Sequence, residues 1–159
     1  MNAGYFLALP LVIIEVFAQD AFEAKSDKAT LDAKNGIHCL TGNVRAKFND
    51  KVFEAATIVI YMSRSNNKPT RIIAKGEVKY TDGANTVRAR MCESDMKTVT
   101  FLQNVTIEGK EYGELKADRL VYEISSKKIR IFSQHRVKLV LSEKVENKIK
   151  QAMLRKKKK

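Results

Sequence analysis

Hydrophobic and polar residues alternate along most of the chain after residue 25. In the segment 44–48, three apolar residues alternate with Arg45 and Lys47. A period of two is typical of a β-strand that buries one of its faces. The same pattern recurs in residues 72–74, 78–80, 99–101, 105–107, 129–131 and 137–141. It predicts a series of strands, each about five to eight residues long.

Turn-forming residues separate these alternating runs. They occur at Asn49-Asp50, 65–69, Asp82-Gly83, Glu108-Gly109 and Ser125-Ser126. Such compositions favour tight connections between strands, and no helical periodicity interrupts them before about residue 141. Short strands joined by short turns predict an all-β antiparallel meander.

The strands also repeat as a unit. Gly42-Asn43-Val44, Gly76-Glu77-Val78 and Gln103-Asn104-Val105 open three segments spaced 34 and 27 residues apart. A small residue follows 13 or 14 positions later in each unit, at Ala56, Ala89 and Ala117. One such unit cannot bury its own apolar face, so the units must stack on one another. We therefore expect a continuous core between two sheets.

These repeat openings and the Ala-Asp-Arg-Leu-Val-Tyr-Glu stretch at 117–123 resemble the OstA-like family over residues 25–142. The resemblance implies a β-jellyroll of two antiparallel sheets, open like a half-pipe, that shields the acyl chains of lipopolysaccharide. It also implies a periplasmic, non-enzymatic role in a transport bridge to the outer membrane. Its partners would be lipopolysaccharide and other OstA-like domains, paired head-to-tail through edge strands. A membrane-anchored component of the same pathway is the alternative within the family.

The alternation itself suggests how such a chain holds lipid. Two sheets that splay apart would present their inner faces as an apolar wall, which gains about 0.8 kcal/mol for each methylene removed from water. An ordinary closed β-core made of the same side chains is the competing interpretation. The residues predicted to face this groove are Val44, Ala46, Phe48, Ile72, Val78, Tyr80, Val99, Phe101, Val105 and Ile107.

An open sheet has edge strands, and these can pair with another chain. We expect the edges near residues 26–31 and 136–142. Charged residues such as Lys28 and Lys138 would instead blunt the edges against pairing.

The first 18 residues form a separate segment in hydropathy. Residues 3–18 are apolar except for Glu15, and Val16 and Ala18 suit the −3 and −1 positions of a signal-peptide cleavage site. The run is short for a bilayer-spanning helix of about 20 residues. A signal peptide over residues 1–18 is therefore expected, with an uncleaved anchor or a buried element of the domain as the alternatives.

The net charge of +12 is unevenly distributed. Residues 144–159 hold eight basic side chains and one acidic one, so this tail carries +7 of the total. We expect residues 143–159 to form a basic tail, either a short amphipathic helix that approaches an anionic membrane or a disordered arm. The remaining basic residues of the outward parity would form a solvated face or contact lipid headgroups: Arg45, Lys47, Arg71, Lys75, Lys79, Arg88 and Arg90.

A basic nucleic-acid-binding β protein is the alternative from another class. The strands lack the clustered aromatic residues that stack on bases, so no nucleic-acid partner is expected. No catalytic or metal-binding motif accompanies His38 and His135, the only histidines, so no enzyme activity, metal or cofactor is predicted. Cys39 and Cys92 would form a disulfide or remain free thiols.

Overall fold

Ten β-strands account for most of the residues that can be placed. The computed structural model describes residues 23–48, 51–81, 83–110, 113–126, 128–134 and 138–141, together with Asn147, Gln151 and Leu154. The strands are β1 (Glu23–Lys25), β2 (Lys28–Asp32), β3 (Ile37–Phe48), β4 (Lys51–Met62), β5 (Pro69–Thr81), β6 (Asn85–Ser94), β7 (Thr98–Gly109), β8 (Gly113–Glu123), β9 (Lys128–Phe132) and β10 (Lys138–Leu141). The predicted all-β class is confirmed.

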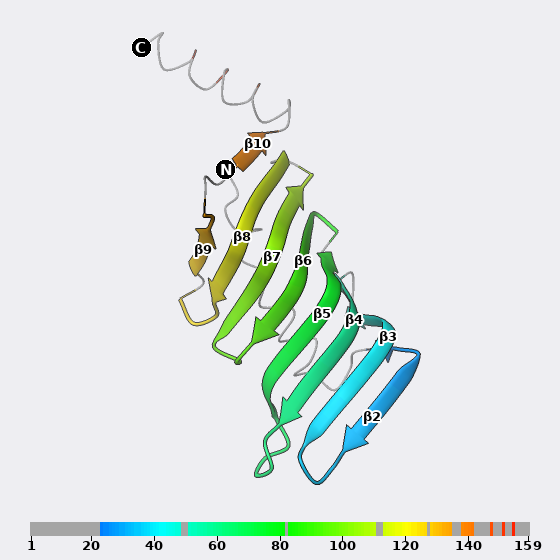
Figure 1. Cartoon of the computed structure of the whole chain (residues 1–159). Helices are drawn as coiled ribbons and strands as arrows, with labels where there is room; N and C mark the ends of the chain where they lie inside the picture. Colours follow the sequence, from blue (N-terminus) through cyan, green and yellow to red (C-terminus); the bar gives the residue numbers. More distant parts are fainter. Residues whose placement is uncertain are drawn as a thin grey trace.

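All ten strands belong to one antiparallel sheet (Figure 1). Its main path runs β1-β3-β4-β5-β6-β7-β8-β10, while β2 pairs with β3 and β9 pairs with β8. The second half of β3 pairs with β1 and its first half pairs with β2, and β8 is divided in the same way between β10 and β9. The sheet thus has a β1 wing, which ends at β10, and a β2 wing, which ends at β9. The two expected sheets are these two wings of one continuous sheet.

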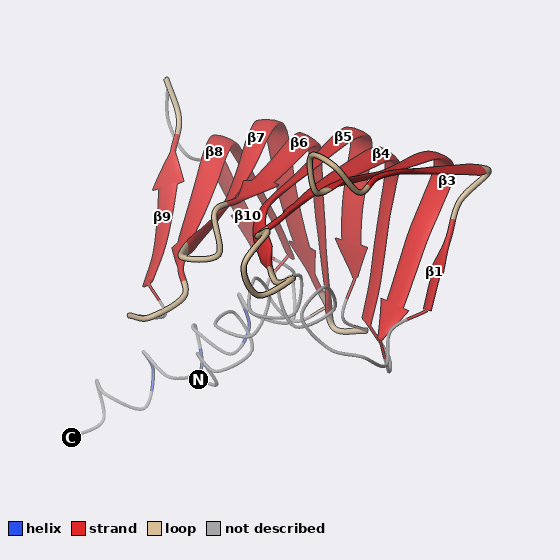
Figure 2. Cartoon of the chain, turned by 90° about the horizontal axis from the view of Figure 1, so that it is seen from below, coloured by secondary structure: helices blue, strands red, loops and turns tan. Residues whose placement is uncertain are grey.

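Each long strand is bent near its middle by a β-bulge. The pairing register shifts at this level between every two neighbouring strands from β3 to β8. Three pairs of successive residues with positive φ mark the bends: Gly42-Asn43, Gly76-Glu77 and Gln103-Asn104. A bulge leaves an extra residue unpaired and bends its strand. The aligned bends form the closed side of a trough (Figure 2).

The bends explain why the predicted strand length was wrong. β3 to β8 are 10 to 13 residues long rather than five to eight. The Gly-Asn or Gly-Glu dipeptides that look like the opening of a new strand lie in the middle of one strand. They interrupt the alternation because the bulge inserts a residue into the ladder.

The repeated small residues lie beside these bends. Gly76 has a φ of +78°, and a Cβ atom at this position would lie 2.6 Å from the Cβ atom of Ala56 on the neighbouring strand. Ala89 and Ala117 pair with Val78 and Val105, the residues that directly follow the next two bends. Small side chains are therefore needed where neighbouring strands turn together.

One apolar core fills the trough between the wings. Its largest fully buried side chains are Tyr80 and Phe53 from the β1 wing and Tyr122 and Phe101 from the β2 wing. Because both wings contribute to a single cluster, the predicted continuous core is confirmed.

Several predictions concern residues outside the described part of the chain. These are the signal peptide or anchor at 1–18, the side chain of Phe48, and most of the basic tail at 143–159. Within the tail, Asn147, Gln151 and Leu154 are described, and each is helical and exposed. No helix among the described residues is long and apolar enough to cross a bilayer.

Candidate functional site

The candidate groove residues lie together on the inner face of the trough. Nine of the ten are only 0–3% exposed and belong to the single apolar cluster: Val44, Ala46, Ile72, Val78, Tyr80, Val99, Phe101, Val105 and Ile107. The side chain of Phe48 lies outside the described part. The sequence therefore identified the inner face, whereas the role of these residues in binding lipid stays a prediction.

The pairing registers join the inward residues into three rows that run from one edge of the sheet to the other. The first two rows lie in the β2 wing and the third lies in the β1 wing. Row 1 is Leu31, His38, Ile60, Ile72, Ser94, Val99, Tyr122 and Ile129. Row 2 is Ala29, Leu40, Ile58, Ala74, Cys92, Phe101, Leu120 and Ile131. Row 3 is Ala24, Ala46, Phe53, Tyr80, Val87, Ile107 and Leu115, and the backbone of β10 pairs with β8 beside its last member.

These rows are closed in the middle and open towards the edges. Their central members are buried, whereas Leu40 and Ile60 near one edge and Leu115, Ile129 and Ile131 near the other are only partly buried. Leu31, at the β2 edge, is 67% exposed. The rows therefore form an apolar track whose two ends are accessible. Alternation alone does not predict that Leu40, Ile60 and Leu115 point inward, because their direction depends on the register across each bend.

The track contains no acidic side chain, lysine or arginine among its described members. Its polar members are His38, Ser94, Cys92 and the two tyrosine hydroxyls. Burial, and to a smaller extent the neighbouring Glu93, raises the pKa of the Cys92 thiol far above its ordinary value. The buried thiol is therefore neutral and behaves as a small apolar group.

The two cysteines do not form a disulfide. Cys92 points into the trough from β6, whereas Cys39 pairs with Val59 on the opposite, outer face of β3 and β4. Because the two side chains lie on opposite faces and β4 and β5 separate their strands, both thiols are free.

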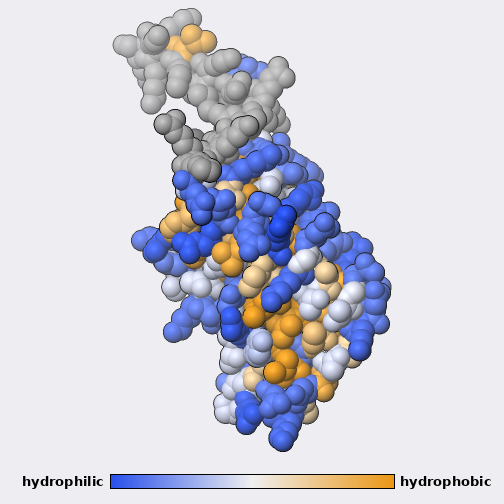
Figure 3. All heavy atoms as spheres, viewed as in Figure 1, coloured by the Kyte–Doolittle hydropathy of each residue, from blue (hydrophilic) through white to orange (hydrophobic). Residues whose placement is uncertain are grey.

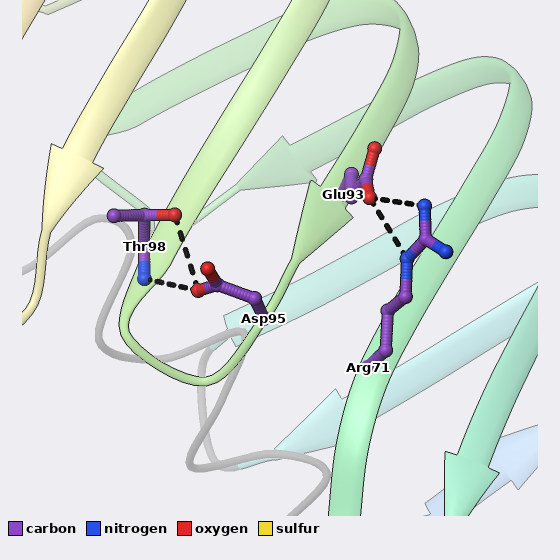
Figure 4. A network of polar contacts seen from close by, with 4 residues as sticks. All are labelled: Arg71, Glu93, Asp95 and Thr98. Carbon is purple, nitrogen blue, oxygen red and sulfur yellow. Dashed lines mark hydrogen bonds and ion pairs between the residues drawn. The ribbon is translucent and has the colours of Figure 1, made fainter.

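The basic residues predicted on the outward parity lie on the outer face of the sheet, and glutamates pair with several of them. Arg71 donates to Glu93 over 2.8 Å (Figure 4), and Arg45 and Lys79 lie 3.6 and 3.7 Å from Glu54. Arg88 is similarly 3.7 Å from Glu108. These pairs are exposed, so each contributes little to stability. The arrangement favours the interpretation as a solvated face over contacts with headgroups at the rim.

Apolar side chains also gather over β3, β4 and β5 in the view of Figure 3. On the outer face of these strands, Cys39, Val59 and Ile73 are cross-strand neighbours, and each is half-buried. Alternation did not predict this patch, because Cys39, Val59 and Ile73 are apolar residues on the face where it predicts polar ones.

The strands at the ends of both wings have free edges. β1 and β2 at one end, and β9 and β10 at the other, have a hydrogen-bonded neighbour on one side only among the described strands. Lys28 and Lys138 lie on β2 and β10, as the sequence suggested. The free edges thus coincide with the regions predicted at 26–31 and 136–142, and β1 and β9 are additional edges.

The placed part of the chain contains no candidate metal centre. Its His, Cys, Asp and Glu side chains form no group of three or more that could hold a metal ion. The apolar track is therefore the feature of the inner face that requires a functional explanation.

Comparison with known proteins agrees with this architecture. No curated protein matches the sequence. The chain is similar to the crystal structure of LptH from Pseudomonas aeruginosa, described as the LptA-homologous periplasmic component of the lipopolysaccharide transport device, with a TM-score of 0.65 and 12% identity over 80% of this chain and 99% of that one. The family model described as LptA/(LptD N-terminal domain) LPS transport protein matches residues 23–157. The chain therefore belongs to the LptA/LptD N-terminal domain family of LPS transport proteins.

Proposed function

We propose that this protein carries lipopolysaccharide across the periplasm and holds its acyl chains between the two wings. The observation that carries the proposal is the apolar track, which runs through eight strands and ends in accessible residues at both edges. A track without charged groups offers acyl chains a similar surface along its whole length. A lipid can then move along it without breaking a specific polar contact.

The energetics of acyl burial are sufficient for such a carrier. Each methylene transferred from water to the track contributes about 0.8 kcal/mol, so a stretch of ten methylenes gains about 8 kcal/mol. The central track residues already pack against each other, with exposed fractions near zero. Packed sheets about 10 Å apart leave no space for a chain, so the wings must splay to admit lipid. The burial energy therefore has to exceed the cost of separating the wings.

Two adjacent residues of β4 provide a matched test. Ile60 points into the track, whereas Val59 points to the outer face, and both are half-buried. We expect Ile60→Asp to weaken lipopolysaccharide binding about tenfold or more, because a carboxylate would replace an apolar contact. Val59→Asp should bind like the unmodified protein. Thermal melts establish that both variants fold, and equal binding by the two folded variants would contradict the groove.

We further propose that the free edges of the wings join this domain to related domains, or to further copies of itself, in a bridge. Exposed edge strands carry unpaired backbone groups that a strand of another domain can complete. The four strands β1, β2, β9 and β10 offer such edges at both ends of the track. Joining them would extend the apolar track from one domain to the next. Sedimentation velocity should show growth with concentration, and a monomer at every concentration would contradict self-assembly.

The proposed role requires a location in the periplasm. N-terminal sequencing of the mature protein from fractionated cells tests this requirement together with cleavage after residue 18. Recovery in the cytoplasmic fraction would contradict the proposed function.

A further inference from the structure

A cavity of about 730 Å³ lies between the β2–β3 turn and the β4–β5 loop, beside the exposed end of row 1. Backbone hydrogen bonds hold its walls together: Met62 donates to the carbonyl oxygen of Gly36 over 2.8 Å, and Ser63 donates to that of Lys68 over 2.8 Å. Gly36 has a φ of +65°, and a Cβ atom there would lie 2.9 Å from the Met62 carbonyl oxygen. The backbones of the turn and the loop are therefore in close contact, and this contact fixes the walls of the cavity between them.

The polar part of this cavity suits an anion. Lys34 and Arg64 line it with His38 and with the hydroxyl and amide groups of the loop, and its lining contains no Asp or Glu. Neither cation forms an ion pair within the described residues, in contrast to the paired arginines of the outer face. The nearby Asp32 accepts two hydrogen bonds from Asn35, over 3.0 and 2.8 Å.

The charge of Arg64 does reach Asp32. The hydrogen bonds from Asn35 are the main cause that lowers the pKa of this carboxyl group, and the positive charge of Arg64 adds to them. No hydrogen bond or ion pair joins Arg64 to Asp32 or to another acidic group among the described residues, so its guanidinium donors are available to another acceptor. Arginine donors form charge-assisted hydrogen bonds with phosphate, and lysine adds a point charge.

The apolar part of the cavity points to a lipid rather than to a free ion. Leu31 and Met62 line the same cavity. Leu31 is 67% exposed and begins row 1, in which it pairs with His38, then Ile60 and then the buried Ile72. A cation pair beside an exposed leucine at the start of an apolar track matches a molecule that carries a phosphate next to an acyl chain.

We propose that Lys34 and Arg64 bind the phosphate group of a lipid whose acyl chain enters the track past Leu31. This inference rests on the proposed function, because it places the headgroup of the carried lipid. The cavity would hold the headgroup at the β2 edge of the sheet while the acyl chain reaches Ile60. It thereby adds one polar anchor to a track that otherwise has no charged group.

The test compares bisphosphorylated lipid A with the same lipid after enzymatic removal of its phosphates. We expect the unmodified protein to bind the phosphorylated form about tenfold more tightly. In the double variant Lys34→Gln/Arg64→Gln this ratio should fall towards one, while affinity for the dephosphorylated lipid stays unchanged. The control is Lys75→Gln/Arg90→Gln, which removes two exposed charges from outside the cavity and should keep the tenfold ratio.

The outcomes separate this inference from the function on which it rests. If the unmodified protein binds neither lipid, the proposed function fails. If it binds both lipids but the Lys34→Gln/Arg64→Gln variant keeps the tenfold ratio, or the control loses it equally, the headgroup site is overturned. Inorganic phosphate at about 10 mM, a concentration that would fill a site with a Kd of about 1 mM, should not compete with the lipid. Competition would assign the cavity to free phosphate and overturn the lipid assignment.

Discussion

Replacement of Gly76 by alanine is the sharpest perturbation of the bend that shapes the trough. Gly76 has a φ of +78°, and a Cβ atom there would lie 2.6 Å from the Cβ atom of Ala56. A left-handed conformation costs an L-residue about 1–2 kcal/mol. Overpacking adds about 1–3 kcal/mol. We therefore expect Gly76→Ala to lower the free energy of unfolding by about 2–5 kcal/mol.

A double-mutant cycle in urea separates the two contributions. Ala56→Gly alone should cost at most about 1 kcal/mol, because it adds backbone freedom in a strand. In the Ala56→Gly background, Gly76→Ala should lower the free energy of unfolding only by the cost of its φ angle, because the contact between the two Cβ atoms is gone. The expected coupling is about 1–3 kcal/mol. A loss below about 0.5 kcal/mol for Gly76→Ala, or no recovery in the double variant, would refute the reasoning.

Three further predictions concern individual side chains. Gln103 occupies a bend with a φ of +66°. Gln103→Gly should therefore raise the free energy of unfolding by about 0.5 kcal/mol. A lower free energy of unfolding in urea would contradict this. Iodoacetamide at pH 8 should label Cys39 in the folded protein but Cys92 only after unfolding, and equal labelling rates would show that the core is open. Burial disfavours the ionised form of Asp95, but hydrogen bonds from Thr98 (Figure 4) and from the backbone of Lys97 outweigh it and lower the carboxyl pKa. The stability that ionised Asp95 contributes is therefore present above the unfolded pKa of about 3.8 and lost as the pH falls through the lower folded value. The loss of stability caused by Asp95→Asn should therefore be larger at pH 6 than at pH 2, and a loss that is equal at both pH values would contradict this assignment.

The alternation of residue types was sufficient to predict the class of fold and most of the inner face. It identified Val99 and Phe101 as inward residues because a strand with one buried face repeats every two positions. Both are fully buried. Each bend inserts residues into a strand, however, and shifts the parity of the positions that follow. The orientation of Leu40 relative to Val44 therefore depends on the bulge at Gly42, which alternation alone does not reveal.

The cavity at Lys34 and Arg64 could not be predicted from the strands. These two cations lie in separate turns, 30 positions apart in the sequence, and neither belongs to an alternating run. They meet only because β2, β3 and β4 are adjacent, which places the β2–β3 turn beside the β4–β5 loop. The basic residues that alternation places on the outward parity, such as Arg71, lie on the outer face, and glutamates pair with several of them.

The central claim is that lipid occupies the space between the wings, and site-specific photo-crosslinking tests it most directly. A photoreactive residue is introduced at Leu40 or Ile131, which point into the track, and at their neighbours Cys39 or Arg130, which point outward. We predict crosslinks to lipopolysaccharide in cells from the two inward positions and none from the two outward positions. Equal crosslinking from both faces, or crosslinking from the outward positions alone, would contradict the account.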